Sequence, residues 1–189
     1  LSYATADRHG IDLIIANDPD ADRLAVAIKD NGVWRRLTGN EVGCLLGWRA
    51  AERHSGSDAP AALAASIVSS PALRQVAAHY GIEYSDTLTG FKFVNRVPNL
   101  IFGYEEALGY LVDPTKVRDK DGISAAVDFL AMAGELRGEG KTIADHLIAF
   151  AETFGAFAST QISIRVNNLS EIPAISGRFR TAPPSHLAG

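Results

Sequence analysis

Short apolar runs separated by polar loops mark the first forty residues. The run that begins at Ile11 predicts one strand, residues 24–28 predict a second, and residues 33–37 predict a third. Asn31 and Gly32 stand between the last two runs, and this dipeptide is typical of a hairpin turn. The N-terminal part of the chain is therefore expected to be rich in strands.

Beyond these strands, segments with helical spacing alternate with short strand-like runs. Asn40 is the expected N-cap of the first helix, with Glu41 in its first turn, and Asp121 is expected to cap a later, long helix. Such alternation predicts an α/β fold, with a mixed sheet flanked by helices. The expected helices cover residues 40–54, 71–80, 122–136 and 143–154, and the expected strands cover residues 62–69, 82–85, 99–104 and 157–166.

The change of pattern near residues 38–40 predicts a domain boundary. Residues 1–39 would be the C-terminal part of one domain, residues 40–155 would form a complete α/β domain, and residues 156–189 would be a strand and a linker toward a further domain. Residues 167–185 lose all periodicity and are expected to be a connection without regular structure.

Three aspartates, Asp18, Asp20 and Asp22, stand at alternate positions after the first apolar run, and Arg23 follows them. In an extended chain alternate side chains point the same way, so these carboxylates are expected to converge. Carboxylates this close repel one another unless a cation neutralises them, and hard oxygen ligands suit Mg²⁺ or Ca²⁺. The loop is expected to hold Mg²⁺ beside a phosphate that Arg23 binds; a solvated acidic turn is the structural alternative.

A calcium-binding EF-hand is excluded, because the sixth and twelfth positions counted from Asp18 hold Arg23 and Lys29 instead of Gly and Glu.

Composition narrows the class of protein. The net charge is −4 and the basic residues form no run, which argues against a nucleic-acid partner. No apolar stretch approaches the roughly 18 residues that span a bilayer, and no signal peptide is apparent, so we expect a cytoplasmic protein without a membrane partner. Because the chain begins at Leu1 instead of Met and ends in T-A-P-P-S-H-L-A-G, both ends are expected to be cuts inside a longer protein.

Cysteine and histidine suggest no metal site of their own. The single cysteine, Cys44, excludes an intrachain disulfide and is expected to be a buried, inert thiol. The histidines show no ligand spacing and are expected to be ordinary residues: His9, His54, His79, His146 and His186.

Two loops follow apolar strands, where open α/β sheets bind their ligands. T-L-T-G-F-K, residues 87–92, offers Gly90 for a close backbone approach and Lys92 as a mobile cation, although an ordinary turn would look the same. G-Y-E-E-A-L-G-Y, residues 103–110, contains Glu105 and Glu106. Adjacent residues in an extended chain face opposite sides, so one glutamate is expected to hold sugar hydroxyls; a glutamate that caps or pairs with an arginine is the alternative.

A third loop, V-R-D-K-D-G over residues 117–122, leads into the long helix. Asp121 is explained as the helix cap. Arg118 and Lys120 precede a helix N-terminus, where backbone N–H groups also favour anions. Together these groups could form a phosphate or proton-transfer site.

These four loops, in this order, resemble the α-D-phosphohexomutase superfamily of phosphoglucomutases and phosphomannomutases. The resemblance covers roughly residues 11–155. The form with G-F-K and E-E-A-L-G-Y is most similar to the branch of phosphoglucomutase-2-like and phosphopentomutase-like enzymes. Members are four-domain enzymes that interconvert hexose 1-phosphate and 6-phosphate through a phosphoserine and a bisphosphate intermediate, so the resemblance implies an isomerase with a sugar phosphate as its substrate.

The resemblance also implies residue roles. In the second domain Mg²⁺ would be held against the phosphoserine, and Arg23 would lie near the transferring phosphoryl group. In the third domain Lys120 would be the general acid or base. Many members carry Ser where this chain has Ala107, so one hydroxyl contact to the sugar would be lost. The implied metal ligands are Asp18, Asp20 and Asp22, and the implied substrate contacts are Thr89, Gly90, Lys92, Glu105, Ala107 and Arg118.

No serine loop and no C-terminal phosphate-binding loop of the family type is present in the sequence. The resemblance therefore implies the end of domain 2, all of domain 3 and the linker to domain 4, with domains 1 and 4 as the missing partners. Such a piece is expected to be inactive by itself, because phosphoryl transfer needs its donor and in-line positioning.

Two other functions stay open. A haloacid-dehalogenase-type phosphatase also begins with D-x-D after a strand, but it needs Thr or Val where Asp22 stands. A non-catalytic sugar-phosphate-binding module would keep Glu105 and Lys92 without the chemistry.

Overall fold

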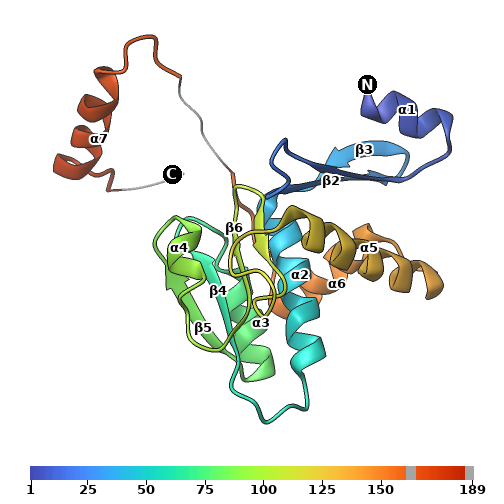
Figure 1. Ribbon diagram of the computed structural model, residues 1–189. Coiled ribbons are helices and arrows are strands. Elements are labelled where there is room, and N and C mark those ends of the chain that lie inside the picture. Colours follow the sequence, from blue (N-terminus) through green and yellow to red (C-terminus); the bar gives the residue numbers. More distant parts are fainter. Residues whose placement is uncertain (161–164, 186–189) are drawn as a thin grey trace. The chain divides into compact units, whose positions relative to one another are not determined.

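The computed structural model describes residues 1–160 and 165–185. The chain divides into two units, Leu1–Ser159 and Thr160–Gly189, which are described separately. The first unit contains two β-sheets with helices packed between and around them (Figure 1).

The first sheet is the antiparallel meander that the N-terminal pattern predicts. It has the order β1-β2-β3, with β1 at Leu13–Asn17, β2 at Leu24–Asp30 and β3 at Val33–Arg36. Asn31 and Gly32 have φ angles of 49° and 81°. These are the positive values that a two-residue hairpin turn requires, so the predicted turn is confirmed.

The second sheet is mixed and has the order β5-β4-β6-β7. The first three of these strands are parallel, and β7 joins β6 antiparallel at the edge. The predicted fold class, an α/β fold with a mixed sheet flanked by helices, is confirmed. The strands are β4 at Ala62–Ser66, β5 at Glu83–Thr87, β6 at Leu100–Glu105 and β7 at Gly109–Leu111.

The long helices lie where the apolar spacing predicts them, whereas the two short helices α1 and α4 were not predicted. The Asp121 side chain accepts hydrogen bonds from the backbone N–H groups of Ile123 and Ser124, so its role as a cap is confirmed. The helices of the first unit are α1 at Ser2–Arg8, α2 at Gly39–His54, α3 at Ala72–Tyr80, α4 at Phe91–Val94, α5 at Gly122–Gly138 and α6 at Ile143–Phe154.

The prediction that Asn40 caps α2 is wrong. Thr38 is the N-cap, and it forms a reciprocal capping box with Glu41, whose side chain accepts from the Thr38 backbone N–H. The Asn40 side chain instead accepts from the backbone N–H of Ser70 and from the Tyr104 hydroxyl. A capping box offers two mutual hydrogen bonds, and this explains why the N-cap lies two residues earlier than expected.

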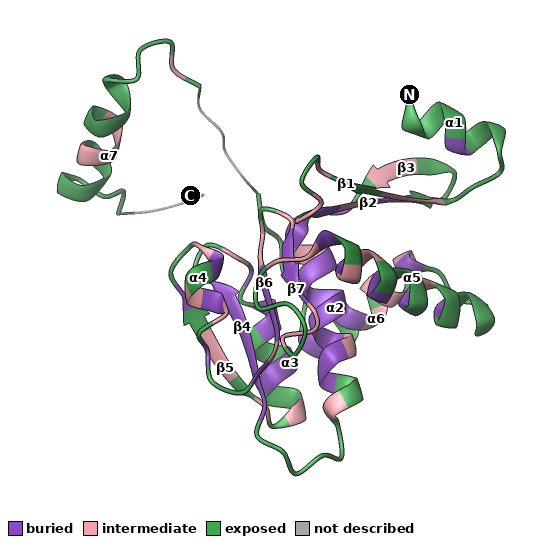
Figure 2. Cartoon of the chain, viewed as in Figure 1, coloured by how far each residue is buried: buried purple, intermediate pink, exposed green. Residues whose placement is uncertain are grey.

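The core of the first unit lies on both faces of the mixed sheet. Leu63 and Ala65 of β4 belong to the large cluster that contains the buried side of α2, whereas Ala62 and Ala64 belong to a smaller cluster with α4. This alternation follows from the two-residue period of a strand. Figure 2 shows that α2 is buried along most of its length.

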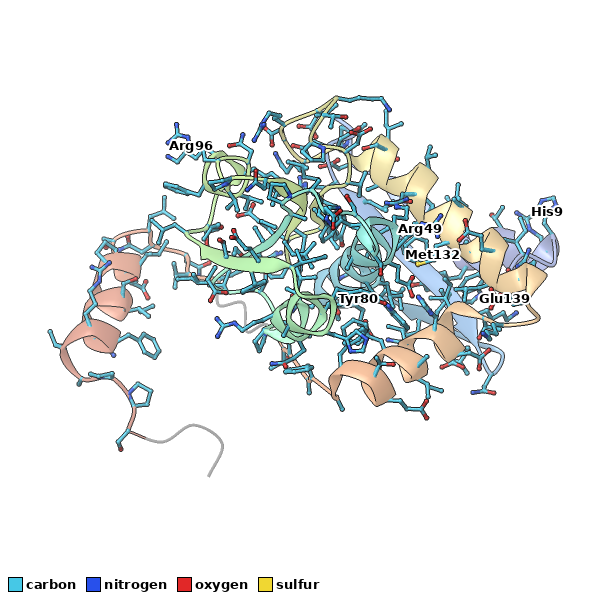
Figure 3. All side chains as sticks on the ribbon, turned by 90° about the horizontal axis from the view of Figure 1, so that it is seen from below. His9, Arg49, Tyr80, Arg96, Met132 and Glu139 are labelled. Carbon is cyan, nitrogen blue, oxygen red and sulfur yellow. The ribbon has the colours of Figure 1, made fainter. Side chains whose placement is uncertain are left out.

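Helix α5 is tied to α2 by a partly buried ion-pair network. Arg49 donates to Asp128 at 2.9 Å and also pairs with Glu135, and Arg53 donates to both carboxylate oxygens of Asp128. Figure 3 shows Arg49 and Met132 in this region. The network holds α5 in place, and the loop 117–122 leads directly into this helix.

The second unit contains α7 at Glu171–Thr181, so the prediction of no regular structure over residues 167–185 is wrong. Pro173 lies in the first turn of the helix, where a missing N–H is tolerated, and Gly177 interrupts the side-chain pattern. Of the predicted strand 157–166, the described residues form no strand and the others lie outside the described residues. No helix in the described part of the chain is long and apolar enough to cross a membrane.

Candidate functional site

The acidic loop between β1 and β2 gathers three carboxylates. Oxygen atoms of Asp18, Asp20 and Asp22 lie within 4.8 Å of one another. The loop is a tight turn and not an extended chain, because the Ala21 backbone N–H donates to the Asp18 carbonyl at 3.0 Å and Ala21 has a φ of 58°. The convergence is present, but the expected reason for it, extended geometry, is wrong.

Two cations contact these carboxylates. Arg23 donates from Nε to Asp18 at 2.6 Å, and the Nζ of Lys120 lies 2.5 Å from an oxygen of Asp22. Burial tends to raise the pKa of Asp18, but the hydrogen bonds from Arg23 outweigh it and leave this pKa below its ordinary value. The hydrogen bond to Asp22 raises the pKa of Lys120, so the ammonium form is favoured. The loop therefore combines three acids with two fixed positive charges.

The acidic loop rests directly on the first turn of α5. The Gly122 backbone N–H donates to the Ala21 carbonyl at 3.0 Å, and the Asn17 side chain donates to the Arg23 carbonyl at 2.7 Å. A Cβ on residue 122 would lie 2.4 Å from the Arg23 carbonyl oxygen and 2.4 Å from Nδ2 of Asn17. Only glycine permits this close approach, which brings Lys120 to the acids.

The glutamate loop, residues 103–110, contacts the acidic loop. The Leu24 backbone N–H donates to the Leu108 carbonyl at 3.1 Å, and Arg23 forms a β-bridge with Gly109. A Cβ on Gly109 would lie 3.0 Å from Cδ of Lys120. The acidic loop, the glutamate loop and Lys120 therefore form one continuous site.

The two adjacent glutamates have different partners, as their alternation predicts. Glu105 accepts a hydrogen bond from the Gly90 backbone N–H at 2.5 Å, so it holds the loop 87–92. Glu106 accepts from the hydroxyls of Ser66 and Ser69 at 3.1 and 3.2 Å. Of the pair, Glu105 is therefore the one whose carboxylate contacts the loop 87–92.

Around Glu105 the remaining predicted substrate contacts are solvent-accessible. Thr89, Lys92 and Ala107 are exposed. The ammonium of Lys92 lies 5.0 Å from the centre of the Phe93 ring and has no carboxylate partner among the described residues. The exposed side chains can therefore contact a ligand without first breaking an ion pair.

Arg118 is engaged by the protein backbone. Its Nη2 donates to the Asn95 carbonyl at 2.8 Å, and the Asn95 side chain donates back to the Arg118 carbonyl at 2.7 Å. This reciprocal pair joins the end of α4 to the loop 117–122. Of the guanidinium, the Nη1 and Nε groups have no hydrogen-bond partner among the described residues.

The sequence did not predict the contacts of several residues around these loops. Their contacts join segments far apart along the chain, and spacing could not reveal them, although a polar residue beside a motif and a glycine at the start of a helix were visible signals. They are Asn17, Ser66, Ser69, Asn95 and Gly122.

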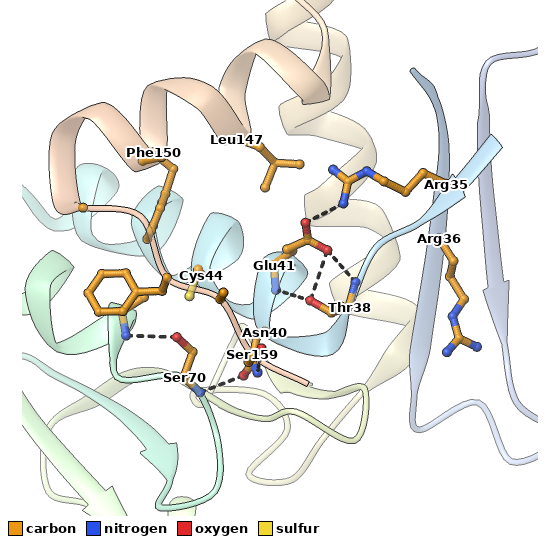
Figure 4. Close-up of a pocket in the computed structure, with 15 residues that line it drawn as sticks. Arg35, Arg36, Thr38, Asn40, Glu41, Cys44, Ser70, Leu147, Phe150 and Ser159 are labelled. Carbon is orange, nitrogen blue, oxygen red and sulfur yellow. Dashed lines mark hydrogen bonds and ion pairs between the residues drawn. The ribbon is translucent and has the colours of Figure 1, made fainter. Parts of the chain in front are cut away.

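A separate cavity of about 360 Å³ lies at the start of α2 (Figure 4). Cys44 lines it, yet this thiol is only 5% exposed, and burial raises its pKa to about 12. The predicted buried thiol is confirmed. The acidic trio does not line this cavity.

Two of the described histidines make ordinary contacts. His54 hydrogen-bonds the Ala59 carbonyl, His146 stacks on Trp48, and neither joins the acidic trio. His186 lies outside the described residues.

The chain is similar to curated sugar-phosphate mutases. It is 53% identical over 190 residues to a probable phosphomannomutase of Haemophilus influenzae, matching 100% of this chain and 39% of that protein. It is 44% identical over 141 residues to a phosphoribomutase of Saccharomyces cerevisiae, matching 66% of this chain and 22% of the relative. The chain therefore spans less than half the length of these relatives.

Solved structures share the fold at lower sequence identity. A phosphoglucomutase from Paramecium, parafusin, matches 77% of this chain and 25% of its own, with a TM-score of 0.64 and 24% identity. The Aspergillus fumigatus N-acetylphosphoglucosamine mutase, solved with GlcNAc-6P and magnesium, matches 82% of this chain and 35% of its own, with a TM-score of 0.57 and 15% identity.

The model of domain III of phosphoglucomutase/phosphomannomutase, an alpha/beta/alpha domain, matches residues 38–154. This match covers more than half of the chain, and it includes the glutamate loop and Lys120. On this basis the chain belongs to the phosphoglucomutase/phosphomannomutase family.

Proposed function

We propose that this chain is the metal- and sugar-binding part of a phosphohexomutase, which interconverts hexose 1-phosphate and 6-phosphate through a phosphoserine and a bisphosphate intermediate. One observation carries the proposal: the acidic trio, together with Arg23 and Lys120, is joined directly to the loop of Glu105. Metal ligands and a sugar-binding carboxylate would thus face the same substrate.

The proposed domain division follows from the same elements. Residues 1–39 would be the C-terminal part of metal-binding domain 2, residues 40–155 sugar-binding domain 3, and residues 156–189 the linker toward domain 4. Two separate sheets support the first boundary, as does the start of the family match at residue 38. Domains 1 and 4 of the same protein would then be the partners of this chain.

The donor set fits Mg²⁺. Three carboxylates supply hard oxygens that lie within 4.8 Å of one another, and Mg²⁺ prefers such oxygen ligands. Asp18, Asp20 and Asp22 would hold the ion. When bound, Mg²⁺ would neutralise charge on the transferring phosphoryl group. The magnesium in the Aspergillus mutase supports this choice.

The neighbouring residues would bind and orient the substrate. Arg23 would hold a phosphoryl oxygen beside the metal, and Lys120, already favoured as the ammonium form, would carry the proton at Nζ as general acid. Oε1 of Glu105 accepts from Gly90, and its other oxygen has no partner among the described residues, so it can accept from a sugar hydroxyl.

The rim of the site would set sugar selectivity. Thr89, Gly90 and Lys92 would contact the sugar phosphate, and the remaining N–H groups of Arg118 would face its phosphate. Ala107 offers no hydroxyl, so the sugar would be bound mainly through hydrogen bonds to the Glu105 carboxylate. We also propose that the parent protein acts in the cytoplasm, because its single described cysteine, Cys44, is a free thiol, which is typical of a reducing compartment.

The test is turnover of glucose 1-phosphate and mannose 1-phosphate by the product of the complete coding sequence. Asp20→Ala should abolish turnover, because it removes one of three metal ligands, whereas the matched control Asp58→Ala, in an exposed loop, should have no effect. Normal turnover by the Asp20→Ala variant would contradict the metal assignment. Release of inorganic phosphate would favour a phosphatase, and binding without turnover would favour a binding module.

A further inference from the structure

The second glutamate of the E-E pair has no role in the proposed chemistry, yet it is the more firmly held of the two. Its carboxylate accepts from Ser66 and Ser69, and its backbone N–H donates to the Ser69 hydroxyl at 3.1 Å. Ser66 is only 1% exposed. We infer that Glu106 is a positioning residue, which with Ser66 and Ser69 braces the glutamate loop so that Glu105 meets Gly90.

The brace acts at the carboxyl end of β4. Ser66 is the last residue of that strand, and the Ser69 backbone N–H donates to the Ser66 carbonyl at 2.9 Å, which turns the chain so that both hydroxyls reach one carboxylate oxygen. The two hydroxyl oxygens lie 2.8 Å apart. This cluster links β4 to the end of β6 at the edge where the site lies.

The opposite side of Glu106 is fixed by α2. A Cβ on Gly39 would lie 1.9 Å from the Glu106 carbonyl oxygen, so the backbone of the loop is packed against the first residue of the helix. The Glu106 residue is therefore held through its side chain, its N–H and its carbonyl. A residue fixed in this way sets the path of the chain on both sides of it.

The position of Glu106 affects the contacts of the residues next to it in the loop. Glu105, one residue before it, holds Gly90, and Leu108, two residues after it, accepts from Leu24 at the end of the acidic loop. Leu108 has a φ of 69°, so the chain turns sharply within this short connection. Loss of the brace would therefore loosen the grip of Glu105 on the loop 87–92, and, insofar as the proposed function holds, would weaken sugar binding through that carboxylate.

The test is hydrogen exchange at the Gly90 amide, followed by NMR in the chain itself, without substrate. Glu106→Ala should raise the exchange rate of this amide about tenfold or more, because the hydrogen bond to Glu105 would open more often. The Lys29 amide, which donates to the Asp12 carbonyl in the other sheet, should not change.

Three variants separate a brace from a general effect on stability. Ser69→Ala should reproduce the faster exchange, since it removes a hydroxyl that contacts Glu106 twice. Glu106→Gln should restore slow exchange, because its amide oxygen can still accept from the serines. Glu152→Ala, an exposed change on α6, is the matched control and should have no effect.

An unchanged Gly90 amide in Glu106→Ala would overturn the inference, and so would a rise that is equal at Gly90 and Lys29. Because this experiment uses no sugar phosphate, such a failure would count against the brace alone. Failure of the proposed function would appear separately, as absent turnover by the complete enzyme with an intact Glu106.

Discussion

Replacing Gly122 with alanine tests how the acidic loop is held. The added Cβ would lie 2.4 Å from the Arg23 carbonyl oxygen and 2.8 Å from that of Ala21, and these two carbonyls flank Asp22. Backbone atoms cannot rotate away as a flexible side chain can. The acidic loop must therefore move away from α5, and Asp22 must move with it, away from Lys120.

The magnitude follows from the contacts that would change. Overpacking against fixed atoms costs about 1–3 kcal/mol, and loss of the hydrogen bond from Gly122 to Ala21 costs about 1 kcal/mol more. Replacing glycine in a helix returns up to about 1 kcal/mol. We expect a net loss of about 1–3 kcal/mol in the free energy of unfolding.

Gly134 provides a matched control in the same helix, because a Cβ there would meet nothing within 4 Å. Gly134→Ala should stabilise the chain by up to about 1 kcal/mol. Both variants can be measured by urea unfolding with tryptophan fluorescence, using Trp34 and Trp48. If the two glycine-to-alanine changes alter the free energy of unfolding in opposite directions, the loss at Gly122 is due to its close contacts and not to the substitution itself. If Gly122→Ala were as stable as the wild type, the packing argument would be refuted.

Three further predictions concern other parts of the first unit. Asp128→Ala removes the carboxylate shared by Arg49 and Arg53, and urea unfolding should show a loss of about 3 kcal/mol or more. Hydrogen bonds from Thr115 and Lys116 lower the pKa of Asp113 to about 2, which an NMR titration of its carboxyl group should show. The ionised Asp113 should therefore stabilise the fold fully above the ordinary pKa of an aspartate, and this stabilisation should disappear as the pH falls toward 2. Cys44, with a pKa of about 12, should react with a thiol reagent at pH 8 only after unfolding.

Local signals explain the parts of the fold that could be predicted from the sequence. The Asn31-Gly32 turn and the Asp121 cap each depend on a few neighbouring residues, and both are confirmed. The cap predicted at Asn40 is wrong because Thr38, which the prediction did not consider, forms a reciprocal capping box with Glu41. Helix α7 was missed because Pro173 and Gly177 weaken its pattern.

The candidate site was predictable only as a set of loops. The acids, Glu105 and Lys120 stand out as residue types, but the contacts that assemble them do not. Glu106 meets Ser66 across 40 positions of the chain, and no spacing rule connects such residues. The close contact at Gly122 likewise depends on two elements that meet only in the folded chain.

The central claim is that the acidic trio binds a divalent cation in a site shared with the glutamate loop. Titration of the ¹⁵N-labelled chain with Mn²⁺, which takes the same oxygen ligands as Mg²⁺, tests it most directly, because the ion broadens amide signals near its site. We predict that substoichiometric Mn²⁺ broadens the amides of residues 18–23, 105–109 and 120–122 first. Broadening centred on other carboxylates, such as Asp113 or Glu139, with those segments unaffected, would contradict the account.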